Sequence, residues 1–360
     1  MPIEFAERIR RIPVYPVASG YDLGTDVAML ASNESCFAPL PEVAAAAGRM
    51  LGGTHRYPDP SYAELRRALS ERYGISPGRI ALGNGSCDIL LAAGEALLEP
   101  GSELVYAWPA FSVYPHLAAA AGARAVVVPL DGEDRHDLDA IAAEITVATR
   151  LVLVCNPNNP TSTAIGLDRV AAFLDRVPAH VCVILDEAYC EFSLSLGDPY
   201  ASLELLRRHP NLVLLRTFSK VYGLAALRVG YALCGSEDFR RAVDQVRQPF
   251  YLNVPAQAAA VEALRHQDEV ERRVAQTIAA RMSLEEELRG RGLWVAESDA
   301  NFIWLRLPEE IDEGDVVKGL AARGVLVRAG GSLGGEGALR VTVGTPSENE
   351  RFLAALRELI

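Results

Sequence analysis

The sequence contains no long apolar run. No window approaches the roughly 18 consecutive apolar residues that a membrane-spanning helix needs, and the first residues, MPIEFAERIRRIPVYP, include no apolar signal core. These absences predict a protein that neither crosses a membrane nor carries a secretion signal. We therefore expect a soluble protein that stays in the cytoplasm.

Spacings typical of metal sites and disulfides are also missing. The cysteines lie in apolar runs without a CxxC spacing, and the histidines form no HExxH pair. The cysteines are Cys36, Cys87, Cys155, Cys182, Cys190 and Cys234. We expect reduced and mostly buried thiols, and we assign no metal.

Basic stretches are scarce. The chain has 35 Lys and Arg residues against 47 Asp and Glu residues, which gives a formal net charge of -12 at pH 7. The run RIRR at residues 8–11 is too short to offset this balance. Because an acidic protein repels nucleic acid and anionic membrane surfaces, we expect neither as a partner.

The apolar content is sufficient for a large core, since 50% of the 360 residues are hydrophobic. Short β-rich runs alternate with helix-length segments at 103–107, 123–130, 150–156, 180–189, 211–217 and 227–234. Near-continuous apolar strands separated by helices indicate an α/β fold with a mainly parallel sheet and helices on both faces. Active sites of such sheets gather at the carboxyl ends of the strands.

The pattern changes near residue 255. A long charged segment with helical periodicity covers residues 254–292, without an intervening strand. Three short strand-like runs follow, ANFIWLRL, GVLVRAG and ALRVTVG, with a helical pattern between the first two. This part predicts a second, smaller α+β domain.

Polar side chains follow several of the predicted strands. CNPNNPTS at 155–162 places Asn159 in a turn before a proline, which by itself is typical of a simple β-turn. DEAY at 186–189 places Asp186 at a strand end, where it either pairs with a cation such as a protonated pyridine nitrogen or accepts backbone N–H groups at a helix start. TFSK at 217–220 places Lys220 after a third strand. A lone lysine there is usually a surface charge, and it is the neighbouring motifs that favour a Schiff-base role.

GNGSCD at 83–88 predicts an anion site. Two glycines and Ser86 precede a helical pattern, so that backbone N–H groups and the helix dipole would face a phosphate. Asp88 stands where a dinucleotide fingerprint needs a small residue, and the P-loop ending is missing, so we expect a phosphate site without a nucleotide motif. Phe111, just past a strand end in WPAFSVY, could stack on a flat ring or pack in the core.

NPNNPT, DEAY, TFSK and the later LRVG, in this order, resemble the fold-type-I pyridoxal-phosphate aminotransferases. The wider match, from LASNES (30–35) and RYPDP (56–60) through RTFSKVYGLAALRVGY to LRVTVGT (339–345), resembles the histidinol-phosphate aminotransferase branch. The resemblance covers nearly the whole chain. It implies pyridoxal 5'-phosphate as cofactor and a homodimer with shared active sites. It also implies an amino-terminal segment (1–35) that packs with the small domain, a large cofactor-binding domain (36–254) and a small carboxy-terminal domain (255–360).

The resemblance also implies a role for each polar residue. Lys220 would bond to the cofactor aldehyde, be displaced by the amino substrate, and then move the proton between substrate and cofactor. The other residues implied are Asp186 at the pyridine nitrogen, Asn159 and Tyr189 at the phenolic oxygen, Phe111 on the ring face, Gly85, Ser86, Cys87, Thr217, Ser219 and Arg228 at the phosphate, and Tyr57 at the phosphate of the neighbouring subunit.

Substrate recognition is expected from Arg328 and Arg340, with Tyr15 and Asn33 beside them, although Arg328 taken alone could equally be a surface charge. Guanidinium groups can bind the phosphate of histidinol phosphate and the carboxylate of glutamate in turn. The implied reversible reaction interconverts histidinol phosphate and 2-oxoglutarate with imidazole-acetol phosphate and glutamate, and runs toward histidinol phosphate in histidine biosynthesis. The alternatives are an aromatic amino-acid aminotransferase, a threonine-phosphate decarboxylase-like enzyme, and a catalytically silent binding protein on the same scaffold. The intact lysine, acid and asparagine argue against the last.

The sequence departs from the family pattern at two places. Ser162 stands where the family has glycine in Asn-Pro-Thr-Gly, and LASNESCFA (30–38) stands for LASNENPYG. The first departure lies in a turn. The second alters residues expected to line the substrate entrance, so it affects the choice of substrate more than the cofactor.

Overall fold

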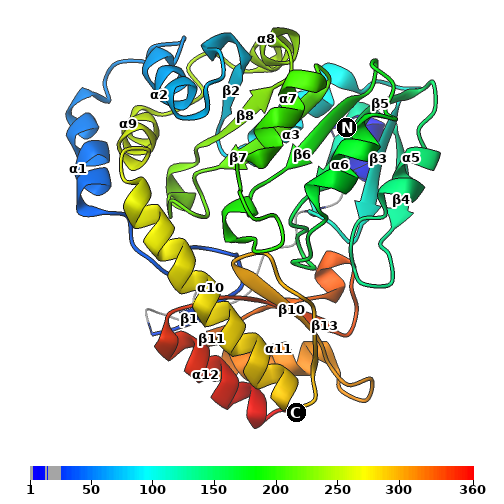
Figure 1. The fold of residues 1–360 in the computed structure, drawn as a ribbon, viewed down its shortest axis with the longest axis vertical. Coiled ribbons are helices and arrows are strands. Elements are labelled where there is room, and N and C mark those ends of the chain that lie inside the picture. The colour runs from blue at the N-terminus through cyan, green and yellow to red at the C-terminus, as the bar shows by residue number, and fades with distance from the viewer. Residues whose placement is uncertain (1–2, 13, 15–25) are drawn as a thin grey trace.

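A computed structural model describes residues 3–12, 14 and 26–360 of the chain. The described residues form a large body, which contains α1–α9 and β2–β8, and a small body, which contains β1, β9–β13 and the helices α11 and α12 (Figure 1). The long helix α10 (Gln267–Gly290) runs from one body to the other (Figure 1).

The large body is built on a seven-stranded sheet with strand order β2-β8-β7-β6-β5-β3-β4. Neighbouring strands from β7 to β4 run parallel, and β8 runs antiparallel to both β7 and β2. The expected mainly parallel α/β sheet is confirmed, with β2 as a strand that the apolar pattern did not reveal. The strands are β2 (Ile80–Gly83), β3 (Glu103–Trp108), β4 (Arg124–Pro129), β5 (Thr149–Cys155), β6 (Cys182–Asp186), β7 (Leu212–Thr217) and β8 (Gly230–Cys234).

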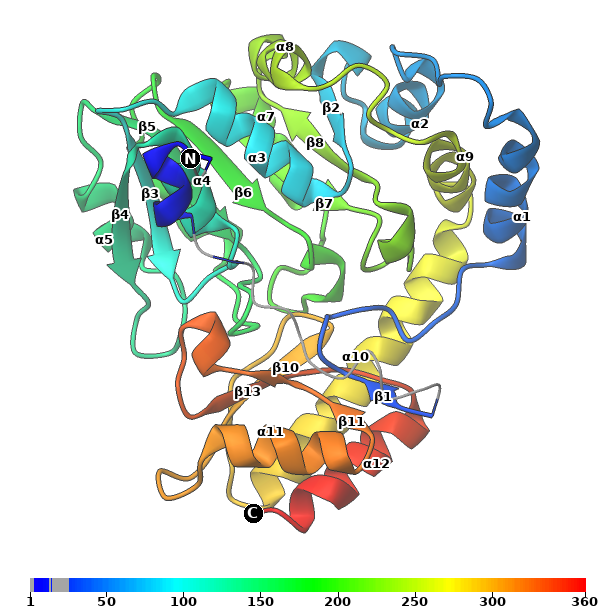
Figure 2. The ribbon, with the colours of Figure 1, turned by 180° about the vertical axis from the view of Figure 1, so that it is seen from behind.

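Helices cover both faces of this sheet because both faces are apolar. One face packs in a core with α1, α2, α5, α6, α7 and α9, and the other packs with α3, α4 and α8, which lie in front in Figure 2. The helices are α1 (Pro41–Arg49), α2 (Ala63–Tyr73), α3 (Ser86–Leu97), α4 (Tyr114–Ala121), α5 (Leu138–Ala143), α6 (Leu167–Leu174), α7 (Leu205–Arg208), α8 (Glu237–Val246) and α9 (Val254–Ala263).

The small body has an antiparallel sheet of order β12-β13-β10-β9 and a separate parallel pair of β1 with β11. The strands are β1 (Ala28–Met29), β9 (Trp294–Val295), β10 (Phe302–Arg306), β11 (Val325–Leu326), β12 (Arg328–Ala329) and β13 (Ala338–Thr342), and the helices are α11 (Glu313–Ala322) and α12 (Pro346–Arg357). Apolar residues of α10, α11 and α12 form its core. This smaller α+β unit is the one expected from the sequence.

Strand β1 and helix α9 indicate where the boundary between the two bodies lies. Strand β1 pairs with β11, so residues 28–29 lie in the small body. Helix α9 packs on α1 and α2 and shares the core of the large body. We therefore propose that the large body extends through α9, somewhat beyond the boundary at residue 254 that the change of sequence pattern predicts.

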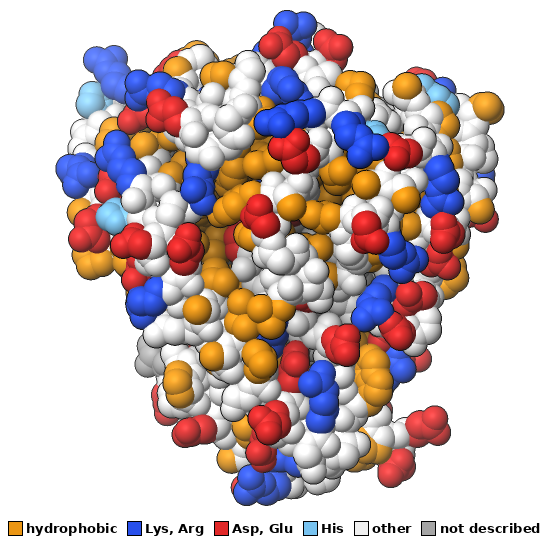
Figure 3. All heavy atoms as spheres, in the orientation of Figure 1, with side chains coloured by type: hydrophobic (Ala, Val, Ile, Leu, Met, Phe, Trp, Pro, Cys, Tyr) orange, Lys and Arg blue, Asp and Glu red, His pale blue; other side chains and the backbone are white. Residues whose placement is uncertain are grey.

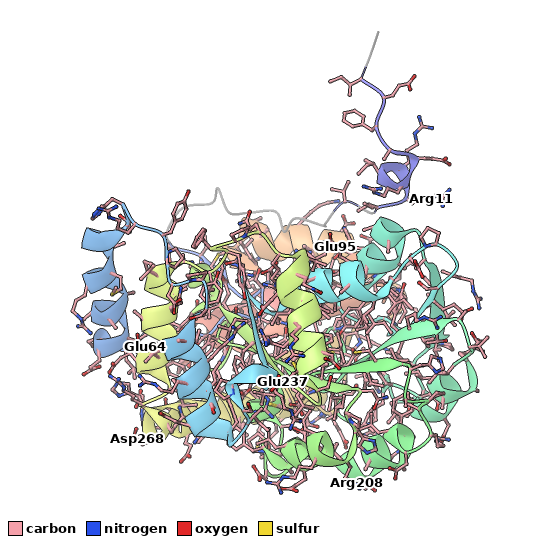
Figure 4. All side chains as sticks on the ribbon, turned by 90° about the horizontal axis from the view of Figure 1, so that it is seen from above. Arg11, Glu64, Glu95, Arg208, Glu237 and Asp268 are labelled. Atoms are coloured by element: carbon pink, nitrogen blue, oxygen red, sulfur yellow. The ribbon has the colours of Figure 1, made fainter. Side chains whose placement is uncertain are left out.

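The surface fits the acidic composition. On the face shown in Figure 3, Lys and Arg side chains are interspersed with Asp and Glu side chains. The short 3-10 helix η1 (Glu7–Arg11) contacts α4 and projects from the layers near the labelled Arg11 in Figure 4. No helix in the described ranges is long and apolar enough to span a membrane.

The turn after β5 holds Ser162 in a left-handed conformation. Its φ is 63°, and the residue is fully buried. Its N–H donates to the Asn158 carbonyl at 2.8 Å, and its carbonyl accepts from the Asp299 N–H at 2.8 Å. The turn thus links the large body to the loop before β10, in a conformation that a side chain disfavours by about 1–2 kcal/mol.

This geometry predicts the effect of changing Ser162. Ser162→Gly should keep the free energy of unfolding or raise it by about 1 kcal/mol, because glycine adopts positive φ freely. Ser162→Val should lower it by about 2 kcal/mol or more, because a β-branched residue at positive φ is strained. Denaturant unfolding of both variants checks this, and a Gly variant less stable than the Val variant would refute the assignment of strain.

Candidate active site

A cavity of about 380 Å³ lies between the two bodies, at the carboxyl ends of β5, β6 and β7. Most of the residues predicted for the site line it. They are Asn33, Ser86, Cys87, Phe111, Asn159, Asp186, Tyr189, Thr217, Ser219, Lys220, Arg228, Arg328 and Arg340. The topology therefore brings together residues that are as far as 300 positions apart in the sequence, in keeping with the general rule for open α/β sheets.

Lys220 lies at the end of β7 and reaches into the cavity. Its Nζ donates to the Ser32 carbonyl at 3.0 Å and lies 5.7 Å from the centre of the Tyr189 ring. Burial, followed by the charge of Arg340, lowers the pKa of Lys220 from 10.5 to about 7. A substantial fraction of the amine is therefore neutral at neutral pH, as nucleophilic attack and proton transfer both need.

Asp186 ends β6 with its carboxylate buried. The Tyr114 hydroxyl donates to Oδ2 at 3.1 Å and the Ala188 N–H donates to Oδ1 at 3.2 Å, and among the described residues no cationic side chain is hydrogen-bonded to it. Burial raises the pKa of Asp186 to about 6. A buried carboxylate that faces a cavity is suited to a cationic group on a ligand, such as a protonated ring nitrogen.

Asn159 and Tyr189 also line the cavity, and hydrogen bonds fix their polar groups. Arg340 Nη1 donates to Asn159 Oδ1 at 2.6 Å, which leaves the Asn159 Nδ2 group as a donor. Asn33 Nδ2 donates to the Tyr189 hydroxyl at 3.2 Å. Burial raises the pKa of Tyr189, so its hydroxyl stays protonated and can also donate. Two donors are thus available for an oxygen of a bound ring.

The first turn of α3 forms an anion cradle. Gly85 has a φ of 79°, and α3 begins at Ser86 without a side-chain cap. The guanidinium of Arg228 lies so close that a Cβ on Gly85 would be 2.5 Å from Arg228 Nη2. Likewise, a Cβ on Gly230 would be 2.4 Å from the Ser86 nitrogen. Glycine at both positions lets β8 and Arg228 approach open backbone N–H groups, which is the arrangement that binds phosphate.

Hydroxyl groups border this cradle from the end of β7. Ser219 and Thr217 are buried and line the cavity. The Ser219 N–H donates to Thr217 Oγ1 at 3.0 Å, which fixes the turn before Lys220. Phe111 lines the cavity as well, with its ring at 85° to that of Tyr114 and 5.9 Å away.

Arg328 and Arg340 face each other across β12 and β13. They are register partners in this antiparallel pair, and each is only 7% exposed. Like charges directly opposite one another destabilise a sheet unless an anion lies between them. Both side chains line the cavity, so we expect them to bind an anionic part of a substrate.

Three predicted residues are not among those that line the cavity, namely Tyr57, Tyr15 and Gly85. Tyr57 is 81% exposed and stacks on Phe250 with ring centres 4.5 Å apart. Tyr15 lies outside the described residues. Gly85 borders the cavity through Arg228 and Ser86, as described above.

The structure adds residues that the motifs did not reveal. They are the Ser32 carbonyl, which accepts from Lys220, Tyr114, which donates to Asp186, and Leu333, which lines the cavity. Tyr114 follows Phe111 by three residues, and this helical spacing beside a predicted ring site was an available signal. Backbone carbonyls and single leucines carry no such signal.

The model of the family described as aminotransferase class I and II matches residues 25–356. The chain belongs to this family. Among curated class I and II relatives, the aromatic amino acid aminotransferase of Thermobifida fusca is 46% identical over 92% of this chain and 89% of its own length. The aromatic amino acid aminotransferase of Nocardia farcinica is 45% identical over 90% of this chain and 89% of its own length. A solved histidinol-phosphate aminotransferase of Sinorhizobium meliloti, in complex with pyridoxal-5'-phosphate, is 28% identical with a TM-score of 0.87 and covers 99% of this chain and 97% of that one.

Class I and II aminotransferases use pyridoxal 5'-phosphate, so the cofactor expected from the sequence is confirmed, and the protein is a pyridoxal-phosphate-dependent aminotransferase. The cavity fits this group chemically. It offers an anion cradle, a buried carboxylate, two hydrogen-bond donors from Asn159 and Tyr189, and a largely neutral lysine amine. The silent binding protein considered from the sequence receives no support from these findings.

Proposed function

We propose that this aminotransferase acts on aromatic amino acids, with 2-oxoglutarate and glutamate as the second substrate pair. The observation that carries the proposal is a cavity that combines two buried arginines with apolar side chains, Phe111 and Leu333. Curated relatives at 39–46% identity are named aromatic amino acid aminotransferases, which supports the same substrate class.

Histidinol phosphate is the second candidate. The sequence pattern alone ranks it first, and the Sinorhizobium meliloti structure with that name supports it at 28% identity. The relatives at higher identity favour the aromatic alternative instead. The two candidates differ physically in one respect, because a phosphate needs both arginines whereas phenylalanine offers a single carboxylate.

For the cofactor, we propose the roles that the geometry supports. When bound, pyridoxal phosphate acts as an electron sink for bonds at the substrate α-carbon. Asp186 would hold its charge against the protonated ring nitrogen, and Asn159 Nδ2 and the Tyr189 hydroxyl would donate to the ring oxygen. The first turn of α3, with Arg228 and Ser219, would hold the phosphate.

Lys220 would move the proton. Its amine is buried and lies beside Arg340, so its pKa is lowered to about 7 and the proton is readily released again. The Ser32 carbonyl, 3.0 Å away, orients the Nζ group within the cavity. A base whose pKa lies near the working pH accepts and returns a proton most efficiently.

The two arginines would divide the recognition of substrates. Arg340 is fixed against Asn159, beside the proposed ring site, and would take the α-carboxylate that phenylalanine and glutamate share. Arg328, opposite it, would take the second carboxylate of glutamate. A change at Arg328 should then separate the two substrates.

The test compares half-reactions of the holoenzyme in single turnover. We expect phenylalanine to react at least about tenfold faster than histidinol phosphate at low concentration. We expect Arg340→Gln to lower kcat/KM for phenylalanine and glutamate by about 10- to 100-fold, the effect of one charge-assisted contact. Arg328→Gln should lower only the glutamate value.

Arg306→Gln is the matched control, because Arg306 lies on the same small sheet, is half exposed, and pairs with Asp134 outside the cavity. It should leave both half-reactions unchanged. A wild-type preference for histidinol phosphate, with a large loss of its use in Arg328→Gln, would replace the proposal with the second candidate.

We further propose that the active site is completed by a partner subunit. Tyr57 does not line the cavity of its own chain, and it stands exposed in a stack with Phe250. An exposed aromatic pair is suited to an interface between proteins. Tyr57 would therefore reach the phosphate site of a second copy, as the resemblance implies.

Complementation tests this arrangement. Lys220→Ala and Tyr57→Ala proteins should each have low activity, and their heterodimers should contain one site with both residues intact. Activity after subunit exchange should therefore rise well above that of either parent. Lack of recovery after proven exchange, or a monomer in solution, would contradict the shared site.

A further inference from the structure

We propose that Leu333 is a specificity-determining residue, the apolar wall against which the side chain of an aromatic substrate packs. This inference rests on the proposed aromatic substrate and deepens it. Leu333 lies in the 3-10 helix η7 (Gly331–Leu333), within the glycine-rich loop 330–337 between β12 and β13. Figure 2 shows the orange segment that contains η7 beneath the end of β3.

The loop is rigid despite its glycine content. The carboxylate of Glu313, at the start of α11, accepts from the Gly331 N–H at 2.8 Å and from the Ala338 N–H at 3.2 Å. Within the loop, the N–H groups of Leu333 and Gly335 both donate to the Gly330 carbonyl, at 2.8 and 2.9 Å. These bonds fix the direction in which Leu333 leaves the backbone.

Tryptophans from both bodies hold the loop in place. A Cβ on Gly334 would lie 2.3 Å from Nε1 of Trp108, which ends β3 in the large body. A Cβ on Gly335 would lie 2.6 Å from the ring of Trp304 in β10 of the small body. Only glycine permits such close contact with the two indoles. The loop therefore closes the cavity where the bodies meet, and Leu333 is its side chain there.

The position of Leu333 relative to the arginines suits an amino acid with an apolar side chain. Arg328 and Arg340 lie on the two strands that the loop connects, and all three side chains line the same cavity. A substrate whose α-carboxylate binds Arg340 can thus place its side chain near Leu333. Covering apolar surface there stabilises an aromatic ring, and it offers nothing to a carboxylate.

Leu333 also packs on Ala296, Trp304 and Ala338, so a purely structural role has to be separated from recognition. The separation comes from comparing two substrates in the same variant. A structural role would affect phenylalanine and glutamate equally. Recognition would affect phenylalanine alone, because the second carboxylate of glutamate is held by charge.

The experiment measures single-turnover half-reactions of the Leu333→Ala holoenzyme with phenylalanine and with glutamate. We expect kcat/KM for phenylalanine to fall about tenfold, which is in the range for lost apolar contact in a specificity pocket. The value for glutamate should change less than about twofold. Leu307→Ala is the control, since Leu307 is buried in the small body but does not line the cavity.

The thermal midpoint of each variant shows whether it is folded. If Leu333→Ala is not folded, kcat/KM for phenylalanine and for glutamate is compared in Leu333→Val instead. Equal losses for both substrates, or no loss for phenylalanine, would overturn the role of Leu333 while leaving the aromatic function in place. A wild-type enzyme that does not use phenylalanine would overturn the proposed function and this inference together.

Discussion

The burial of Lys220 beside positive charge is the constraint on which the rest of the site depends. Burial and the charges of Arg340 and Arg228 together lower the pKa of the lysine to about 7, with Glu34 opposing them. A cationic cavity in a chain of net charge -12 favours the entry of anions. We therefore propose that the charges which, with burial, keep the amine available for chemistry also favour a phosphate-bearing cofactor and carboxylate substrates.

Arg340 connects the cavity around Lys220 to both bodies of the fold. It lies on β13 of the small body, donates to Asn159 of the large body, and donates through Nη2 to the Ala31 carbonyl at 2.6 Å. The residues proposed to hold the cofactor thus come from the large body, whereas the arginines proposed to bind the substrate come from the hairpin β12–β13. This separation gives a physical reason why relatives with the same cofactor chemistry can differ in substrate, because the hairpin can change while the sheet does not.

The sequence revealed the fold and much of the cavity because both depend on local patterns. Apolar runs marked the long strands, and the polar residues directly after them, such as Asp186 and Lys220, lie together at the sheet edge. The four-residue strand β2 was too short for the apolar pattern. Leu333 was missed because its role arises from contacts between distant segments, whereas Tyr114 was missed although its spacing from Phe111 was an available signal. The preference for histidinol phosphate rested on the wider match from LASNES to LRVTVGT, and the relatives at higher identity favour the aromatic alternative.

The chain contains two lysines, so both the identity of the lysine that binds the cofactor aldehyde and its pKa can be measured directly. Lys318 is 80% exposed on α11, pairs with Asp315, and does not line the cavity that contains Lys220. Cofactor-free protein can be mixed with pyridoxal phosphate at a series of pH values, reduced with borohydride, and digested for peptide mapping. We expect the label on the Lys220 peptide, with a rate of attachment that rises with pH to a plateau and has its midpoint near the lowered pKa of about 7. Label on Lys318, or a midpoint near the ordinary lysine value of 10.5, would contradict this expectation.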